Sequence, residues 1–244
     1  MRSSQCEAIV LGVMEYREAD CLVALFTLEH GKLRGIAPGA KKSRRRFAGI
    51  LEPFARLRLE IAVKEGLSRL HGADPVTVYP GIRRELVKIA HAGYACELSE
   101  QFLPEGGSNP RLYRLLVSYL EQLDSAPFAP SDRAFFEVNF LNILGYRPSL
   151  DHCVSCGGAI LPGDPRRFAP AAGMLLCEGC GKGGRVFLPQ AAELLLRALR
   201  TGRFGAVTFP PAALREAEEL LDGAIAAHLV RPLKSLAFLR EIGE

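Results

Sequence analysis

The sequence predicts an α+β protein with an N-terminal five-stranded OB-fold β-barrel and an all-α domain that holds an inserted four-cysteine zinc ribbon. Three observations predict this. Five short strand-like segments lie within residues 1–78, and apolar residues recur at helical spacing from residue 81 onward. Two Cys-x-x-Cys pairs lie in a Gly/Pro-rich insert at about 150–184. We therefore expect a nucleic-acid-binding domain at 1–78 and a helical domain with the zinc-binding insert at 79–244.

The predicted strands are rich in β-forming residues and are separated by turn signals. They cover residues 6–13, 20–28, 33–37, 54–63 and 67–73. In the fourth segment, apolar Leu57, Leu59 and Ile61 alternate with polar positions, which is the period-2 pattern of a half-buried strand. Five such strands in so short a segment favour a small closed barrel of the OB type. We expect Arg56 and Arg58 to project outward from it.

Helical periodicity, Pro and Gly mark the remaining elements. Helices are predicted at 81–103, 111–123, 131–144, 189–200, 211–229 and 233–241. Ser131 is expected to cap the third helix, whose apolar residues cover most of its surface and make it the central core helix. In the helix at 211–229, the expected buried stripe consists of Leu214, Ala217, Leu221, Ile225 and His228.

Composition favours a soluble cytoplasmic protein. The longest apolar run, Cys21 to Phe26, is far shorter than the ~18–20 residues of a membrane span. The N-terminal residues lead into no secretory apolar region. The seven cysteines are an odd number, and in a reducing compartment the two tight pairs favour a metal site over a disulfide framework.

The positive charge is concentrated in residues 32–58, which hold nine basic side chains and one acid, Glu52. Such a cluster creates a potential that attracts polyanions. The alternative is a solvated basic loop without a partner, but the charges continue into the flanking strands and favour a nucleic-acid surface. The expected DNA-binding residues are Lys32, Arg34, Lys41, Lys42, Arg44, Arg45, Arg46, Arg56 and Arg58.

The cysteine spacing C-x2-C-x20-C-x2-C is typical of zinc ribbons. It assigns Cys153, Cys156, Cys177 and Cys180 as ligands of one Zn²⁺. Four thiolates fill a tetrahedral sphere, so the ion is expected to be structural and His152 is not needed as a ligand. Two disulfides or a redox Cys-x-x-Cys pair are the alternatives, and the missing βαβ unit disfavours the second.

We find no catalytic residues in the sequence, because a P-loop, a G-x-S-x-G elbow and an HExxH motif are all missing. Cys6, Cys21 and Cys96 are interpreted as small core residues, and Phe47 and Phe54 as anchors of the basic loop. Arg197, Arg200 and Arg203 lie three residues apart in the sequence. Such a row is usually a solvent-exposed helix face; the alternative is that it extends the DNA-binding surface.

Several segments, in order and spacing, resemble the bacterial recombination-mediator family RecO. They are Glu7–Leu11, Tyr16–Asp20, Leu25–Lys32, Gly39–Phe47, Leu51–Phe54, Gly145–Pro148, Phe168–Pro170 and Gly173–Cys177. The resemblance implies binding of single- and double-stranded DNA and annealing of complementary strands. It also implies partnership with RecR and contact with the acidic C-terminal tail of the single-strand-binding protein SSB, so that RecA loads at gaps.

The expected function is therefore that of a non-catalytic, nucleoid-associated mediator of DNA repair. An RNA-binding OB/zinc-ribbon protein linked to translation or RNA metabolism is the alternative. A nuclease or deaminase would need a carboxylate cluster or a metal with an open position, and neither is visible. A pure interaction scaffold with incidental charge is the fourth interpretation.

Overall fold

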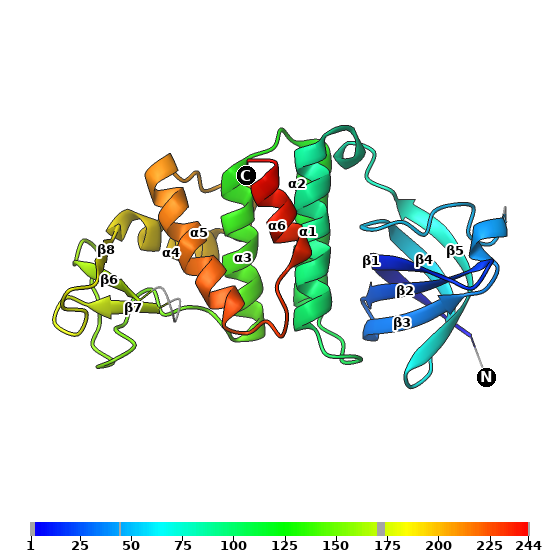
Figure 1. The fold of residues 1–244 in the computed structure, drawn as a ribbon, viewed down its shortest axis with the longest axis horizontal. Coiled ribbons are helices and arrows are strands. Elements are labelled where there is room, and N and C mark those ends of the chain that lie inside the picture. Colours follow the sequence, from blue (N-terminus) through cyan, green and yellow to red (C-terminus); the bar gives the residue numbers. More distant parts are fainter. Residues whose placement is uncertain (1–2, 44, 170–173, 244) are drawn as a thin grey trace. The chain divides into compact units, whose positions relative to one another are not determined.

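The computed structural model describes residues 3–43, 45–169 and 174–243, which form two compact units (Figure 1). Unit 1 comprises Met1–Phe128 and Leu233–Glu244, and unit 2 comprises Ala129–Pro232. Within the part of the chain that the structure describes, no helix has both the length and the apolar content needed to cross a membrane.

The N-terminal strands close into a barrel in the order β1-β2-β3-β5-β4. Their bounds are Ser4–Tyr16 for β1, Asp20–Thr27 for β2, Gly31–Ala37 for β3, Arg56–Ala62 for β4 and Leu67–Thr77 for β5. All pairings are antiparallel except the short parallel pairing of β3 with β5. The predicted OB-like barrel is confirmed.

Alternation along the strands builds the barrel core. Leu57, Leu59 and Ile61 of β4 have no exposed surface, while Arg58 and Glu60 between them are exposed. Cys6 and Cys21 join this core as small apolar residues, as predicted. The core also takes side chains from outside the strands, because the loop between β3 and β4 contributes buried residues of its own.

The helices of unit 1 pack against one side of the barrel and against one another. They are the 3-10 turn η2 (Ile82–Arg84) and helices α1 (Leu86–Phe102), α2 (Pro110–Ser125) and α6 (Lys234–Glu241). The Cys96 thiol of α1 lies 3.9 Å from the Val10 carbonyl oxygen of β1, and the Tyr113 ring of α2 meets Phe26 of β2 edge-on at 5.4 Å. Glu97 of α1 accepts hydrogen bonds from the backbone amides of Lys234 and Ser235, which fixes the start of α6.

Unit 2 is built around α3, as the sequence predicts. Helix α3 (Pro130–Leu144) contacts α4 (Pro189–Thr201) and α5 (Pro211–Ala226) and buries most of its side chains. A small sheet of order β7-β6-β8 lies between α3 and α4 in the sequence. Its strands are β6 (Arg166–Ala169), β7 (Met174–Cys177) and β8 (Arg185–Phe187).

Two expectations for unit 2 are wrong in detail. Ser131 is not the cap of α3, because the helix begins at Pro130 with Ala129 at the cap position. The Ser131 hydroxyl instead accepts a hydrogen bond from the backbone amide of Phe209, at 3.0 Å. His228 does not belong to the buried stripe of α5, which ends at Ala226; it is exposed and stacks on Tyr146 with ring centroids 4.2 Å apart.

Candidate nucleic-acid interface and metal centre

Two of the predicted basic residues, Lys32 and Arg56, make contacts inside unit 1. The Lys32 ammonium on β3 donates to the Glu100 carbonyl oxygen of α1 at 2.8 Å. Burial lowers the pKa of Lys32, although the charges of Glu100 and Glu105 act against this shift. The Lys32 side chain therefore helps to hold α1 on the barrel.

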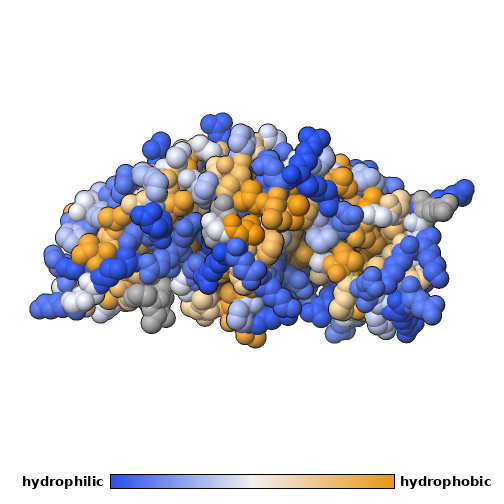
Figure 2. Space-filling view, turned by 45° about the horizontal axis from the view of Figure 1, so that its top comes forward, coloured by the Kyte–Doolittle hydropathy of each residue, from blue (hydrophilic) through white to orange (hydrophobic). Residues whose placement is uncertain are grey.

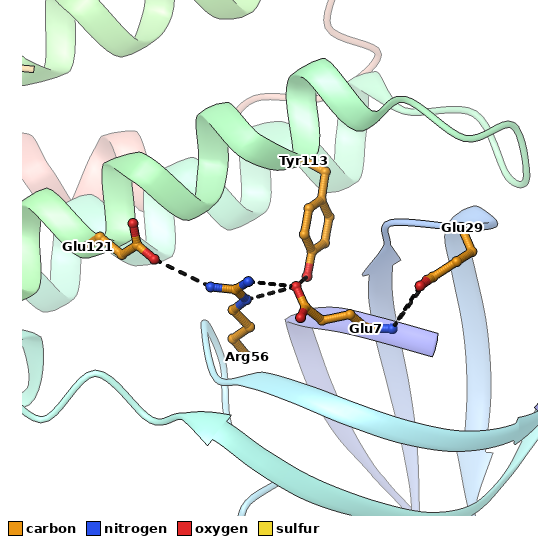
Figure 3. A network of polar contacts seen from close by, with 5 residues as sticks. All are labelled: Glu7, Glu29, Arg56, Tyr113 and Glu121. Carbon is orange, nitrogen blue, oxygen red and sulfur yellow. Dashed lines mark hydrogen bonds and ion pairs between the residues drawn. The ribbon is translucent and has the colours of Figure 1, made fainter. Parts of the chain in front are cut away.

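Arg56 is the centre of a polar network between β1, β4 and α2 (Figure 3). Its Nη2 atom lies 2.8 Å from Glu7 Oε1, and its Nη1 atom lies 3.3 Å from Glu121 Oε1. Burial acts to lower the pKa of Arg56, but the hydrogen bond and negative charge of Glu7 outweigh it, so the pKa is raised. A guanidinium that two carboxylates share in this way is poorly placed to bind a phosphate.

The basic loop between β3 and β4 is fastened to the barrel at several points. It contains the 3-10 turn η1 (Ala40–Lys42), whose Lys41 amide donates to the Ala19 carbonyl oxygen at 3.0 Å. Asp20 accepts from the Gly39 amide at 2.8 Å. Further along, the Arg46 carbonyl oxygen accepts from the Ala73 amide of β5 at 2.9 Å. The described residues of the loop are therefore fixed to the barrel at both ends of the basic segment.

Phe47 and Phe54 anchor this loop, as predicted. Both rings are buried, with 1% and 5% of their surface exposed. Burial of Phe47 anchors the loop directly after Arg45 and Arg46, which are both exposed. Arg46 also lies over the Phe47 ring at 5.4 Å and donates to the Pro38 carbonyl oxygen at 2.8 Å.

The structure brings three of the predicted residues together in one groove. Arg45 and Arg46 of the loop and Arg58 of β4 line a groove of about 160 Å³. Its other lining residues are Gln5, Leu59, Glu60, Gly72, Ala73 and Asp74. Although residues 45 and 58 are well separated in sequence, the hydrogen bond between Arg46 and Ala73 places the loop beside the β4–β5 ladder.

The other predicted basic residues differ in whether they form ion pairs. Lys41 is paired with Glu15 at 2.6 Å, and Arg34 with Glu105 at 3.1 Å. Within the described residues, the exposed side chains of Lys42, Arg45 and Arg58 make no ion pair. Glu52, the one acid of the basic segment, is bound by Arg83 at 2.7 Å and so neutralises none of them. Arg44 lies outside the described residues.

Sequence reasoning missed the acidic partners Glu7, Glu15 and Glu121. The register of β1 against β4 supplies part of the missing signal, because it sets Glu7 opposite Arg58 and Gln5 opposite Glu60. Alternation along β1 therefore puts Glu7 on the outward face that Arg56 and Arg58 share. The contact of Arg56 with Glu121 depends on how α2 packs on the barrel, and no local sequence pattern predicts that packing.

The row Arg197, Arg200 and Arg203 does not lie on one helical face. Helix α4 ends at Thr201, and Gly202 follows with a φ of 63° in the left-handed region. Arg203 therefore lies beyond the helix. Arg197 and Arg200 are exposed, and Arg200 lies in the last helical turn, where a cation is favourable.

The four predicted cysteine ligands form one cluster in unit 2. The Sγ atoms of Cys153, Cys156, Cys177 and Cys180 all lie within 4.8 Å of one another, and those of Cys156 and Cys177 are 3.9 Å apart. Tetrahedral zinc with Zn–S bonds of ~2.3 Å sets its sulfurs about 3.8 Å apart. The cluster therefore has the size and chemistry of a tetrathiolate metal site.

Glycines shape both turns of this cluster, for different reasons. The Gly157 amide donates to the Cys153 carbonyl oxygen at 2.8 Å, and Gly157 has a φ of 72°, which favours glycine. The Gly181 amide makes the equivalent bond to Cys177 at 2.9 Å. At Gly181 the reason is space, since an added Cβ would lie 2.3 Å from the Arg167 Cβ atom.

The thiols of the cluster differ in acidity. Hydrogen bonds from the backbone of Cys177 and Cys156 lower the pKa of Cys153 to about 6. Hydrogen bonding with the thiols around it, that of Cys177 first, raises the pKa of Cys180 to about 12. Four adjacent thiols cannot all ionise without a cation between them, so this group is suited to a divalent metal ion.

The metal cluster is joined to the rest of unit 2 through β8. Arg185 of β8 pairs with Glu216 and Glu219 of α5 and lies over the Phe168 ring of β6 at 5.1 Å. Phe168, Leu175 and Phe187 are buried beneath the small sheet. The insert thus has a small apolar core of its own, which the cluster completes.

The fold and these two sites define an OB-barrel protein with a helical part and a four-cysteine cluster that is able to hold a metal ion. Family models for the Recombination protein O N terminal and the Recombination protein O C terminal match residues 1–79 and 83–237. The chain belongs to the RecO family of DNA repair proteins.

Full-length relatives agree with this assignment. DNA repair protein RecO of Geobacter metallireducens is 62% identical over 242 residues, which covers 99% of each chain. The protein of the same name from Geobacter sulfurreducens is 60% identical with the same coverage. That of Myxococcus xanthus is 43% identical over 97% of each chain.

Proposed function

We propose that this protein is a non-catalytic DNA-binding mediator of recombinational repair. In this role it binds single- and double-stranded DNA and anneals complementary strands. The observation that supports this proposal best is the convergence of Arg45, Arg46 and Arg58 in one groove, with the exposed Lys42 in the same loop. Relatives named DNA repair proteins favour DNA over RNA as the ligand.

The proposed mechanism is electrostatic. Cationic side chains of the barrel neutralise phosphates and release condensed counterions, which makes the affinity fall as salt rises. If about six side chains touch phosphate, the log–log slope on duplex DNA is about −5. Two strands held on one positive surface repel each other less, which favours annealing. Lys32 and Arg56 make contacts inside unit 1, and Arg34 and Lys41 are held in ion pairs. Among the described residues, Lys42, Arg45, Arg46 and Arg58 are therefore the better candidates for this surface.

We further propose that one Zn²⁺ occupies the four-cysteine cluster. Zinc prefers tetrahedral thiolate ligands, and four of them leave no open position for water or substrate. When bound, the ion supplies charge neutralisation and cross-linking and no reaction chemistry. Cys153, Cys156, Cys177 and Cys180 would hold it, and the small sheet β7-β6-β8 would depend on it for order.

The proposed partners rest on membership of the RecO family. We propose that the protein works in the cytoplasm, associated with the nucleoid, and that it acts with RecR. In the same proposal it contacts the acidic tail of SSB and thereby permits RecA to load at gaps. A surface for that tail is best sought on the helices, since the barrel presents the groove to DNA.

The decisive experiment is strand annealing on SSB-coated oligonucleotides. We expect Lys42→Gln/Arg45→Gln/Arg46→Gln to reduce the annealing rate at least tenfold, an effect equivalent to about 1.4 kcal/mol. The matched control is Arg111→Gln/Arg114→Gln/Arg215→Gln, which removes the same charge from exposed arginines on α2 and α5. Equal losses in both variants would contradict a specific role for the loop.

Competition between RNA and DNA oligonucleotides of matched sequence tests the RNA-binding alternative, because the 2′-hydroxyl is the systematic difference in the backbone. We expect no preference for RNA. Incubation of labelled DNA with the protein and Mg²⁺ tests for nuclease activity, and we expect the DNA to stay intact. Preferential RNA binding or cleavage of the DNA would overturn the proposed function.

A further inference from the structure

The outer surface of the barrel bears a partly exposed apolar row that the basic groove does not include. Met14 of β1 pairs with Leu22 of β2, and Leu22 pairs with Ile36 of β3. The three side chains alternate with core residues and therefore point outward. Met14 is 62% exposed, and Leu22 and Ile36 are partly exposed. Three adjacent apolar side chains on an open sheet form a continuous patch.

The same outward face is covered elsewhere in unit 1. Ile9 and Phe26 lie further along the same strands and are completely buried, because α1 and α2 pack over them. Glu100 of α1 reaches Gly12, where an added Cβ would lie 3.7 Å from Oε2. The row that starts at Met14 is less covered by the described residues, since Met14 is 62% exposed and Leu22 and Ile36 are partly exposed. Figure 2 shows apolar residues exposed among hydrophilic ones on the visible surface of the barrel.

Arginines border the apolar row. Arg69 of β5 is the cross-strand neighbour of Ile36, is exposed and makes no ion pair within the described part of the chain. Arg34 is exposed on β3, two residues from Ile36, although Glu105 is its ion-pair partner. Arg17 lies over the Tyr16 ring at 5.1 Å, at the β1–β2 turn. A ligand with flat apolar faces and a polyanionic backbone matches this arrangement.

The row is also continuous with the basic loop. The loop is bonded to the β1–β2 turn through Ala19 and Asp20, and Asp20 pairs with Tyr16 in the register of β1 against β2. A strand whose phosphates lie along the loop is therefore led toward Tyr16 and the apolar row. Duplex DNA keeps its bases stacked inside and has no apolar face to offer.

We propose that Met14, Leu22 and Ile36 form a platform for the unstacked bases of single-stranded DNA. The platform lets the barrel distinguish a single strand from a duplex, which the phosphate contacts alone do not. This inference rests on the proposed DNA-binding function and adds a second subsite to it, because apolar side chains of the sheet take up base faces while the loop holds phosphates.

The chain contains no tryptophan, so a single introduced indole reports directly on this surface. The test uses full-length Met14→Trp and, as control, Leu86→Trp, because Leu86 of α1 is 58% exposed and lies outside the row. An oligothymidylate of about 16 nucleotides and a duplex of equal length are the probes. We expect the single strand to quench Met14→Trp fluorescence, the duplex to leave it unchanged, and neither to affect Leu86→Trp.

A second measurement compares affinities by anisotropy. Met14→Ser/Ile36→Ser should weaken single-strand binding about five- to tenfold and change duplex binding by less than about twofold. If single-stranded DNA binds with unchanged affinity and without quenching, the platform is refuted while the basic groove stands. If neither DNA form binds at low salt, both the platform and the proposed function fail.

Discussion

Arg56 Nη2 lies 2.8 Å from Glu7 Oε1, and the Tyr113 hydroxyl donates to the same oxygen at 3.0 Å. Arg58, two residues further along the same face of β4, makes no ion pair in the described residues and lines the groove instead. Two arginines on the same face of one strand thus have different surroundings. Substituting each of them should separate the effect on stability from the effect on DNA affinity.

We predict that Arg56→Gln lowers the free energy of unfolding by about 2 kcal/mol, because it leaves the half-buried Glu7 carboxylate without its counter-charge. Arg58→Gln should change the free energy of unfolding by less than about 0.5 kcal/mol. Chemical denaturation measures both values. DNA affinity should show the reverse order, and a larger loss of affinity in Arg56→Gln at a temperature where it is folded would refute this division.

The salt dependence of duplex binding should report how many basic side chains of the barrel contact phosphates. Lys42→Gln/Arg45→Gln/Arg58→Gln removes three of the exposed side chains without an ion pair, so the slope of log affinity against log salt should shrink by about 3. Titrations over a range of NaCl concentrations measure the slope. An unchanged slope would exclude these side chains from phosphate contact.

Metal removal should affect unit 2 and spare the barrel. We predict one zinc per chain by elemental analysis, and we expect a strong chelator or Cys156→Ser to open residues 150–184 to protease. DNA binding should persist, since the groove and the cluster belong to different compact units. Zinc-free protein with an equally protected insert would show that the cluster does not hold the ribbon together.

Gly31 is predicted to be the most demanding glycine of the barrel. It has a φ of 72°, and an added Cβ would lie 2.2 Å from the Gly107 carbonyl oxygen. Gly49 provides the control, because its φ is 75° but no atom of the described residues lies within 4 Å of its added Cβ. Gly49→Ala should cost about 1–2 kcal/mol of backbone strain. Gly31→Ala should cost clearly more by thermal unfolding; equal costs would mean that the loop at Gly107 gives way.

Thiol titration should divide the cysteines into two groups. Burial raises the pKa of Cys6 and of Cys96 to about 12, from 9.0 in an exposed thiol, with a smaller contribution from Glu29 at Cys6. Both should resist a thiol reagent at pH 8 until the protein unfolds, whereas Cys156 of the metal-free protein is exposed and should react at once.

The same burial predicts a loss of stability at alkaline pH. The folded state holds the Cys6 and Cys96 protons more tightly than the unfolded chain does. Their contribution is therefore complete below about pH 9 and is lost as the pH rises toward 12. Cys6→Ala should flatten the alkaline limb of stability against pH, as urea denaturation between about pH 8 and 10.5 would reveal.

The fold could be predicted from the sequence because its signals are local. The alternation of Leu57, Leu59 and Ile61, the proline at the start of α4, and the spacing of the cysteines each depend on a few neighbouring residues. Helix ends were harder to predict: Ser131 has good capping chemistry, but the helix begins at Pro130 and the hydroxyl serves Phe209 instead.

The binding surface could be predicted only in part, since charge pairing is a tertiary property. Nine basic residues look alike in sequence, yet the fold gives Arg56 two carboxylates and Lys32 a carbonyl oxygen, and it leaves Lys42 and Arg58 without an ion pair in the described residues. The groove likewise depends on the contact of Arg46 with Ala73, which is set by how the loop lies on the barrel.

Unit 1 is discontinuous along the chain, because α6 follows Ala129–Pro232 in sequence and packs on α1. The Glu97 carboxylate of α1 accepts hydrogen bonds from the first backbone amides of α6. During synthesis on the ribosome, the barrel and α1 emerge long before their last helix exists. Barrel assembly can therefore begin early, while the surface of α1 that α6 will occupy stays exposed until residues 234–241 have been synthesised. A premature stop after residue 232 would leave that surface open to chaperones and proteases.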